Sequence, residues 1–442
     1  MIKLRKVVIV SAMATGMAGS PLAARAAETG ADEQQRKLEA RVEELERQLR
    51  ELTQKTSGAP AATTVDTPTV QAKPITPNAV AGTRFIYSGF VKLDALWSDY
   101  QDGEIADGSI GRDFYLPSTI PVGGVGVGEG VDFDSHIKQS RFIFGTDTDL
   151  AGGGLLSSRL EVDLYGSALG DERATNTYGV QVRHAYLQYG RWLVGQTWSN
   201  FMDATTLPET ADFIGPTDGT IFVREPMVRY TLGNWSFSAE NPETTITPLG
   251  GGTRIASDDN NIPDLTAAYT WKLGVGTLRA AALVRQLKYE TTGVGAVNDS
   301  TQGAALSLAG KINFGKHDLR FAITGGAGLG RYVGVNFAND AVLTATGELE
   351  TISGWAAFAA WRQVWNDRVR STLMVSASDY DNDARLTGGN ANKSSWSWAF
   401  NTFYSPLAKL DLGVELRIAE REIQSGASGS MRRLQAVARY SF

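Results

Sequence analysis

The chain has 442 residues, 48 of them glycine and none cysteine, and its formal net charge is −6. The absence of cysteine excludes a disulfide scaffold, a thiolate metal site and a thiol nucleophile. The three histidines, His136, His184 and His317, are far apart in the sequence and lack the spacing of a zinc site, so we expect no metal and no cofactor.

Residues 1–26 have the pattern of a secretory signal peptide. Lys3, Arg5 and Lys6 precede an apolar stretch that is too short to cross a bilayer as a helix, and the sequence "ARA" at residues 24–26 fits a cleavage site. No later segment has the run of about 18 apolar residues that a membrane-spanning helix needs. This excludes a helical inner-membrane protein and leaves a secreted, periplasmic or outer-membrane product.

Residues 27–56 contain a heptad repeat. Its apolar positions follow one another at steps of four and three residues, and they are Leu38, Val42, Leu45, Leu49 and Leu52. Because so narrow a stripe is marginal on an isolated helix, we expect a coiled coil through which the chain associates with copies of itself. Residues 57–83, rich in proline, threonine and alanine, predict an extended linker.

From residue 84 to residue 442 the sequence changes to strands in which apolar and polar residues alternate. In "RFIYSGFVKLDALWS" (residues 84–98), for example, Val91, Leu93 and Trp97 share one parity, whereas Lys92 and Asp94 share the other. About sixteen such strands are joined by tight turns that alternate with long loops, and no helical period interrupts them. This pattern is typical of a transmembrane barrel, so we predict an all-β, 16-stranded antiparallel barrel. A soluble β-sandwich or lectin domain is the alternative, which the strand length and the tryptophan-rich apolar face disfavour.

The sequence ends within a strand, "RRLQAVARYSF" (residues 432–442). Because a bilayer offers no water to an unpaired sheet edge, we predict that this strand pairs with the first and closes the barrel. Tyr440 and Phe442 lie on its apolar parity. Such an ending resembles the signal by which the barrel assembly machinery of the outer membrane recognises its substrates.

Several segments of the chain resemble a known family. They are "GFVKLDALWS" (89–98), "RHAYLQYGRWLVGQTWSNFMD" (183–203), "LPETADFIGPTDGTIFVREPMVRYT" (207–231), "ENPET" (240–244) and "FYSPLAKLDLGVEL" (403–416). Together they are similar to the DcaP-like trimeric porins of Gram-negative bacteria, a family named for dicarboxylic acid uptake. The resemblance implies a homotrimer with a periplasmic coiled coil, a barrel among the lipid and lipopolysaccharide of the outer membrane, and diffusion of small, mainly anionic solutes. In this sequence Glu225 and Pro226 follow Arg224, and the acid argues against a simple anion site at Arg224.

The parity that faces the lumen of such a barrel carries a basic excess. The predicted pore-lining residues are Lys92, Arg141, Arg159, Arg229, Arg285, Arg320, Arg362, Arg370, Arg417 and Arg439. We expect them to face water and to bias the pore toward anions. Residues 84–442 as a whole hold 31 basic and 39 acidic residues, a net charge of −8. Much of the acid lies in long loops such as 99–136, where we expect solvated carboxylates, screened from the constriction by salt, rather than a divalent-cation site.

The third long loop, residues 199–219, is the segment that we expect to fold inward and narrow the channel. Its candidate constriction residues are Asp203, Glu209, Asp212 and Phe213. We predict that this acidic, partly aromatic edge faces a ladder formed by Arg141, Arg159, Arg229 and Arg320. The resulting transverse field would orient polar solutes and favour anions.

The sequence therefore predicts an outer-membrane porin, not an enzyme, that passes small anionic solutes such as dicarboxylates or aromatic carboxylates and binds no nucleic acid. A general or sugar-selective porin is the alternative, but a sugar channel has aromatic residues inside the lumen, and here most have the outward parity. A structural tether and a barrel enzyme are less favoured. His184 fits a wall histidine better than a catalytic one, and the glycine-rich segment 121–130 is not followed by the helix of a phosphate loop.

Overall fold

The computed structural model describes residues 82–124, 127–128, 130–166 and 178–442, together with the helical residues Ala40, Glu43, Glu44 and Arg47. The chain divides into two compact units, Met1–Thr69 and Val70–Phe442. The predicted signal peptide, the five residues of the coiled-coil seam and nearly all of the linker lie outside the described residues. None of the helices among the described residues is both long and apolar enough to cross a membrane.

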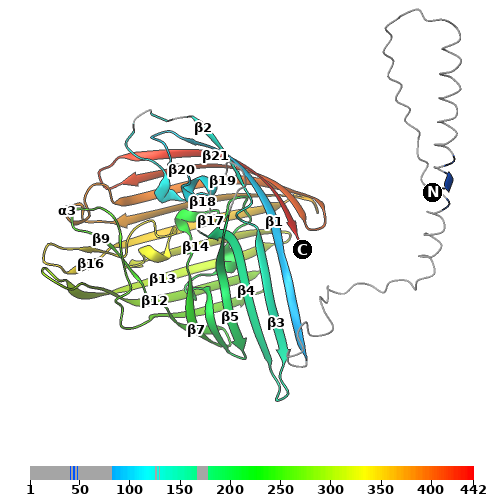
Figure 1. Ribbon diagram of the computed structural model, residues 1–442, viewed down its shortest axis with the longest axis horizontal. Coiled ribbons are helices and arrows are strands. Elements are labelled where there is room, and N and C mark those ends of the chain that lie inside the picture. Colours follow the sequence, from blue (N-terminus) through cyan, green and yellow to red (C-terminus); the bar gives the residue numbers. More distant parts are fainter. Residues whose placement is uncertain are drawn as a thin grey trace, which may run out of the picture. The chain divides into compact units, whose positions relative to one another are not determined.

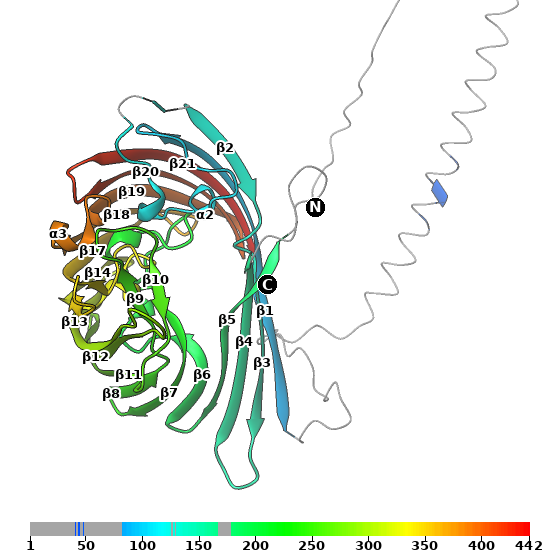
Figure 2. The same cartoon turned by 60° about the vertical axis from the view of Figure 1, so that its left-hand side comes forward.

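The second unit is a closed antiparallel β-barrel (Figures 1 and 2). Its strands are β1 (Thr83–Tyr100), β2 (Val131–His136), β3 (Arg141–Asp149), β4 (Leu155–Gly166), β5 (Gly179–Tyr189), β6 (Trp192–Trp198), β7 (Arg224–Leu232), β8 (Trp235–Glu240), β11 (Asp264–Leu273), β12 (Gly276–Glu290), β13 (Asn298–Phe314), β14 (His317–Ala327), β17 (Ser353–Val364), β18 (Val369–Asp381), β19 (Asn392–Leu407), β20 (Leu410–Ile423) and β21 (Ser428–Ser441). Because β2 and β3 pair with successive halves of β1, these 17 strands occupy 16 positions. The pairing of β21 with β1 closes the barrel, so the predicted 16-stranded barrel is confirmed.

The alternation of side chains in β1 shows why this sequence forms a barrel wall. Val91, Leu93 and Trp97 are exposed on the outside, whereas Lys92 and Asp94 are buried on the inside. An apolar outer band and a polar interior are the arrangement that a bilayer requires of a closed sheet. The parity assigned from the sequence is therefore correct for this strand.

Tight turns of two to five residues at one end of the barrel alternate with longer connections at the other. The connections are L1 (101–130), L2 (167–178), L3 (199–223), L4 (241–263), L5 (291–297), L6 (328–352), L7 (382–391) and L8 (424–427). Only L8 departs from this alternation, since β20 and β21 are joined by a turn of four residues. Several tight turns contain glycine at positive φ, as at Gly190 and Gly233, where a side chain would be strained.

The loops contain short elements of their own. They are α2 (Ile110–Asp113) and η1 (Pro117–Thr119) in L1, η2 (Ala204–Thr206) and η3 (Thr217–Gly219) in L3, η4 (Gly330–Tyr332) in L6 and α3 (Ala384–Thr387) in L7. L4 and L6 also form a small sheet from β9 (Thr244–Thr247), β10 (Ile255–Ser257), β15 (Ala341–Leu343) and β16 (Leu349–Thr351). Figure 1 shows these elements inside and at one end of the barrel.

Much of the apolar core lies between these loops and the inner wall. Phe201 of L3 packs with Tyr332 of L6 and with Leu283 of β12, and Tyr115 of L1 packs with Met431 of β21. Since core residues bury apolar surface that would otherwise meet water in the lumen, the loops are fixed parts of the barrel interior.

Candidate functional site

L3 crosses the lumen from one wall to the opposite one. It leaves the wall after β6, a strand of only seven residues, and therefore enters the barrel well below the rim formed by the longer strands. On the far side, Glu415 of β20 accepts hydrogen bonds from Thr210 Oγ1 at 2.6 Å and from Ala211 N at 2.9 Å. The carboxylate of Asp218 accepts hydrogen bonds from Ser376 of β18 and Ser397 of β19, at 2.6 and 2.5 Å. In this structure the third long loop, L3, therefore lies inside the barrel.

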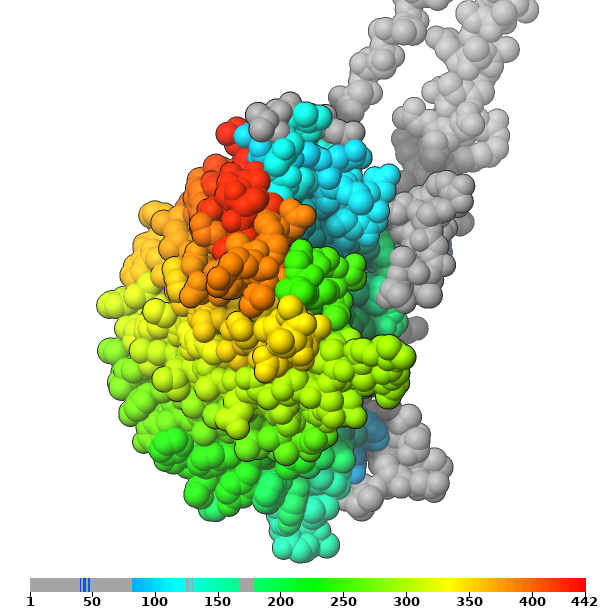
Figure 3. Space-filling model, turned by 90° about the vertical axis from the view of Figure 1, so that its left-hand side faces the viewer, coloured from blue at the N-terminus to red at the C-terminus, as the bar shows by residue number. Residues whose placement is uncertain are grey.

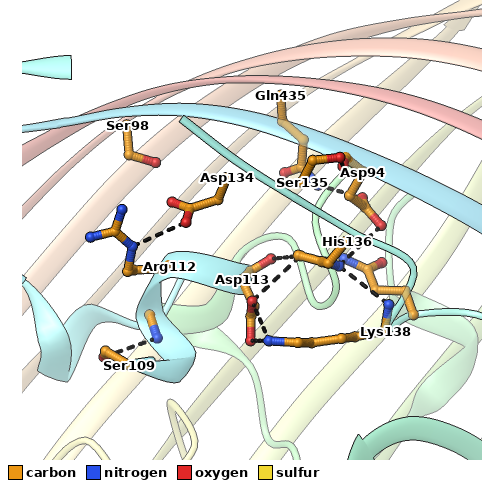
Figure 4. Close-up of polar contacts among 12 residues, drawn as sticks. Asp94, Ser98, Ser109, Arg112, Asp113, Asp134, Ser135, His136, Lys138 and Gln435 are labelled. Atoms are coloured by element: carbon orange, nitrogen blue, oxygen red, sulfur yellow. Dashed lines mark hydrogen bonds and ion pairs between the residues drawn. The ribbon is translucent and has the colours of Figure 1, made fainter. Parts of the chain in front are cut away.

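L1 supports L3 from above. Figure 4 shows how α2 is tied to β2: Arg112 Nε donates to Asp134 at 3.1 Å, and Lys138 Nζ contacts Asp113 at 2.7 Å. Just beyond α2, Tyr115 donates its hydroxyl to Asp218 of L3 at 2.6 Å. Burial and the Asp218 carboxylate raise the pKa of Tyr115 well above its usual value, so the hydroxyl keeps the proton that it donates. Among the described residues no cluster of acids or histidines is arranged to hold a metal ion.

Most of the ten predicted pore-lining residues form ion pairs, so they do not make a free basic wall. Nine of them contact a carboxylate: Lys92 with Asp94, Arg141 with Glu161, Arg159 with Asp147, Arg285 with Asp264 and Asp340, Arg320 and Arg362 with Asp318, Arg370 and Arg439 with Asp411, and Arg417 with Glu415. The expectation that these charges are solvated is wrong for Lys92, Arg285 and Arg417, which are at most 5% exposed. The loops that fill the lumen remove water from these side chains, and a charge without water needs a partner.

The acids of L3 also have partners other than those predicted. Glu209 is paired with Arg370 at 2.7 Å, Asp212 accepts hydrogen bonds from backbone N–H groups, including that of Tyr115 at 2.8 Å, and Asp203 caps η2. None of the three contacts the predicted arginine ladder. Two members of the ladder, Arg229 and Arg320, donate instead to backbone carbonyl groups at the ends of this loop segment, those of Trp198 and Leu207.

Where L3 leaves the wall, three arginines lie close together, and two of them, Arg183 and Arg224, lie over one group of aromatic rings. We call this group the arginine–aromatic cluster, and it consists of Arg141 of β3, Arg183 of β5, Arg224 of β7, Trp198 at the end of β6, and Phe213 and Phe222 of L3. Two carboxylates, Glu161 and Asp163 of β4, lie beside it. The three arginines of the cluster and these two carboxylates together have a formal charge of +1.

Arg183 is the most enclosed member of the cluster. Its Nε donates to Glu161 at 2.8 Å and its Nη1 to Asp163 at 2.7 Å, while Phe213 lies 5.2 Å from the guanidinium carbon. The register of β4 against β5 shifts at this point, from His184 opposite Glu161 to Val182 opposite Val162. A bulge of this kind redirects the extra residue, so Arg183 points inward although simple alternation assigns it to the outside.

Arg224 is the member without a carboxylate partner among the described residues. Its guanidinium carbon lies 5.0 Å from the centre of the Trp198 ring and 5.6 Å from that of Phe222, and its Nη1 is buried without a hydrogen-bond partner. Glu225, the next residue, does not neutralise it, because Glu225 is paired with Arg331 of L6 at 2.9 Å. The argument from sequence against an anion site at Arg224 is therefore wrong. The acid and the arginine are adjacent in the chain, but their side chains serve different clusters.

His184 lies at the edge of the arginine–aromatic cluster. Its Nδ1 is 3.0 Å from Thr197 Oγ1, and its ring packs edge-on against Trp198. These contacts are those of a histidine that braces the wall.

On the side of the tight turns, a pocket of about 380 Å³ lies beneath L3. Arg229 and Arg279 line it, and neither is paired with a carboxylate of a described residue. Arg279 instead donates to the backbone and side-chain oxygens of Asn200, each at 2.8 Å. The pocket thus presents two further guanidinium groups that have no ion pair with a carboxylate of a described residue.

Comparisons with known proteins agree with this architecture. The family model described as DcaP outer membrane protein matches residues 145–442. The outer membrane channel DcaP of Acinetobacter baumannii is 26% identical, with a TM-score of 0.68 over 82% of this chain and 99% of that chain. OmpT of Vibrio cholerae, 11% identical with a TM-score of 0.50 over 82% of this chain and 99% of that chain, shares the fold alone.

No curated protein matches the chain. The match to the family model covers well over half of the sequence, and the family is one of membrane channels rather than enzymes. The chain belongs to the DcaP outer-membrane protein family, and its barrel is that of an outer-membrane channel.

Proposed function

We propose that this protein is a homotrimeric channel of the Gram-negative outer membrane and that it passes small anionic solutes, namely dicarboxylates or aromatic carboxylates. The observation that carries the proposal is Arg224, a guanidinium held between two aromatic rings where L3 enters the lumen, with no ion pair to a carboxylate of any described residue. An unpaired, partly desolvated cation attracts an anion more strongly than one that is already neutralised.

The chemistry of the arginine–aromatic cluster matches such solutes. A guanidinium can donate two parallel hydrogen bonds to one carboxylate, and it keeps its charge at every physiological pH. The rings of Trp198, Phe213 and Phe222 offer apolar surface next to it. A carboxylate attached to an aromatic ring would find both kinds of contact in one place.

Ion selectivity in a planar bilayer tests the proposal. In a salt gradient, the reversal potential of the wild-type channel should show anion selectivity, and Arg224→Gln should reduce it. Arg362→Gln is the matched control, because Asp318 would still be paired with Arg320 at 2.6 Å and the rest of the wall would be unchanged. A cation-selective wild-type channel would contradict the proposal, as would equal effects of the two substitutions.

A sugar-selective channel is the second candidate, and one structural feature favours it. The sequence suggested that few aromatic residues face inward, but Phe114, Tyr165, Trp198, Phe213 and Phe222 form a connected group inside the barrel. Sugars stack on such rings. Swelling of proteoliposomes in isosmotic sugar solutions would decide between the candidates. A sugar-selective channel should have a higher ratio of disaccharide influx to inorganic-anion influx than a general porin has.

The oligomeric state and the N-terminal segment are also part of the proposal. We infer that the heptad repeat of residues 27–56 joins three chains in the periplasm. Deleting residues 27–83 and measuring both oligomer size and solute flux would separate this role from a tether to peptidoglycan. If the deletion abolishes the trimer but solute flux is retained, the segment serves oligomerisation. If the trimer stays intact but the outer membrane separates from the peptidoglycan, the segment serves as a tether.

The C-terminal residues give a proposal about assembly. Phe442 exchanges two backbone hydrogen bonds with Gly89, at 3.0 and 3.2 Å, and its ring lies 5.3 Å from that of Tyr87. We propose that Tyr440 and Phe442 serve as the signal read by the barrel assembly machinery, while the outer apolar band contacts lipid and lipopolysaccharide. Deletion of Phe442 should reduce the amount of folded barrel in the membrane without changing the conductance of the channels that form.

A further inference from the structure

A second basic pocket lies away from the constriction, at the end of the barrel where the long loops gather. Figure 3 views this face, on which L7 (orange) and L6 (yellow) are exposed. L4, L6, L7 and the adjoining ends of β19 and β20 enclose a cavity of about 360 Å³, which we call the outer pocket. Its polar side chains are Thr247, Arg254, Asn339, Asn382, Thr387, Asn390, Asn392 and Arg421. Because the long loops of such barrels face the outside of the cell, the outer pocket faces incoming solutes.

Two guanidinium groups line the outer pocket without a carboxylate partner among the described residues. Arg254 of L4 donates to Asn339 Oδ1 at 2.5 Å and to the Asn336 carbonyl at 2.6 Å. Arg421 of β20 donates to Asn392 Oδ1 at 2.8 Å and to the Ile120 carbonyl at 2.7 Å. Neutral oxygens hold both side chains in place and leave both charges uncompensated. The Nη1 of Arg254 and the Nη2 of Arg421 have no protein acceptor among the described residues.

The acids around the outer pocket are already used elsewhere. Asp383 is paired with Arg385 at 2.6 Å, and Glu422 is paired with Lys393 at 2.7 Å. Asp340, the acid nearest to Arg254 in L6, is fully buried and paired with Arg285 at 2.8 Å. The net charge that the pocket offers to a ligand is therefore positive.

We infer that the outer pocket binds small hydroxycarboxylates and loads them into the channel, an inference that rests on the proposed anion flux. Arg254 and Arg421 supply charged donors for carboxylate groups. The surrounding amides and hydroxyls can both donate and accept, which matches a hydroxyl group on the solute. Asn390, whose side chain has no hydrogen bond to any described residue, is free to make that contact.

The ligand class separates the outer pocket from the constriction. The arginine–aromatic cluster offers rings and charge, whereas the outer pocket offers amides, hydroxyls and charge. Two dicarboxylates of the same length, malate and succinate, differ by one hydroxyl group and are therefore the appropriate probes. We expect the outer pocket to prefer malate by about fivefold, the worth of one net hydrogen bond.

The test is calorimetric titration of the purified full-length protein with malate and with succinate, carried out in the Arg224→Gln background to weaken the constriction site. Malate should bind more tightly than succinate, and adding either Arg254→Gln or Arg421→Gln should raise the malate dissociation constant about tenfold. The double substitution Asp383→Asn, Arg385→Gln is the control, because it removes an exposed ion pair of the same loop face without changing the net charge, and neither residue lines the pocket.

Channel recording gives a second readout that does not depend on calorimetry. Malate added on the loop side should block the wild-type current at lower concentration than malate added on the turn side, and Arg254→Gln should weaken only the loop-side block. Arg254→Lys, which keeps the charge, should retain part of the block and so exclude a folding defect. Equal affinity for malate and succinate, or equal effects of Arg254→Gln and of the double substitution Asp383→Asn, Arg385→Gln, would overturn the inference. Cation selectivity with intact malate binding would instead overturn the proposed function alone.

Discussion

The two sides of the lumen use arginine in different ways. On the wall from β14 to β21, two carboxylates are each shared by two arginines: Asp318 contacts Arg320 and Arg362, at 2.6 and 2.7 Å, and Asp411 contacts Arg370 and Arg439. In the arginine–aromatic cluster, on the wall from β3 to β7, the guanidinium of Arg224 has no ion pair with a carboxylate of the described residues, and it lies over aromatic rings instead.

A count of charges does not reveal this difference, since arginines outnumber carboxylates in both groups, by four to two around Asp318 and Asp411 and by three to two in the cluster with Glu161 and Asp163. What differs is the contact made by each guanidinium. At Asp318 and Asp411, each of the four arginines touches an acid, and the excess charge is spread over a hydrogen-bonded network that holds the wall together. At Arg224, which has no ion pair with a described carboxylate, the excess charge is localised on one guanidinium. Substitutions in L3, in the cluster and on the wall from β14 to β21 test this difference.

The largest effect should come from Asp218→Ala, which removes the anchor that presses L3 against the β18–β19 wall. Asp218 is fully buried and accepts hydrogen bonds from Tyr115, Ser376 and Ser397. Its loss would leave buried donors unsatisfied at a cost of about 2–4 kcal/mol and would release the loop. We expect single-channel conductance to at least double and anion selectivity to fall.

Asp203→Ala is the control for that experiment, because Asp203 caps η2 within L3 and makes no hydrogen bond to the far wall. A conductance that is the same in the Asp218→Ala and wild-type channels would show that L3 is not held by this anchor.

Removing an aromatic member of the cluster should have the next largest effect. Phe213 covers Arg183 and packs against Tyr165 and Phe114, with ring centres 4.7 and 5.2 Å apart. In Phe213→Ala we expect block by benzoate to weaken about fivefold, since a cation–π or ring contact contributes about 1 kcal/mol, while block by succinate changes little. Equal weakening of both blocks would mean that the ring shapes the pore but does not bind solute.

Glu161→Gln should increase anion selectivity, whereas the preceding substitutions should reduce anion selectivity or anion binding. Glu161 contacts both Arg141 and Arg183, at 3.2 and 2.8 Å, so neutralising it would leave two more guanidinium groups with less compensation. We expect the ratio of anion to cation permeability to rise about twofold, by the Coulomb attraction of a partly screened charge. The reversal potential at low salt measures it, and a shift toward cations would contradict the role assigned to the cluster.

The smallest effect should come from Arg439→Gln on the wall from β14 to β21. Asp411 would still be held by Arg370 at 2.9 Å and by Ser405 Oγ at 2.6 Å. We expect the free energy of unfolding to fall by less than about 1 kcal/mol, with an unchanged reversal potential. Denaturant titration of the folded barrel together with bilayer recording would check both quantities.

Period-two alternation was sufficient to predict most of the fold. The alternation shows on which face of the sheet each side chain lies, and a closed sheet in a bilayer has only two faces. The number of strands, the positions of the turns and the pairing of the last strand with the first could therefore be predicted. The inward course of L3 could also be predicted, because a long loop rich in apolar residues needs a surface to pack against.

The candidate site was harder to predict because it depends on departures from that alternation. Arg183 lies at a bulge in β5, where the alternation shifts by one residue, and Arg224 is the first residue of β7. Simple alternation along either strand would place the side chain outside the barrel. Parity also says nothing about which carboxylate meets which arginine. Arg370, for example, is paired with Glu209, a residue 161 positions away in the chain.

The anchoring of L3 has a consequence for the order of events during biogenesis. Its hydrogen bonds to β18, β19 and β20 join residues 158, 179 and 205 positions apart. Contacts between such distant positions form late, because long stretches of chain must first be fixed. L3 therefore has no anchor until β18, β19 and β20 are in place, so every new molecule passes through a stage in which the loop is unseated. The pairing of β21 with β1, which joins positions still further apart, then closes the barrel around it.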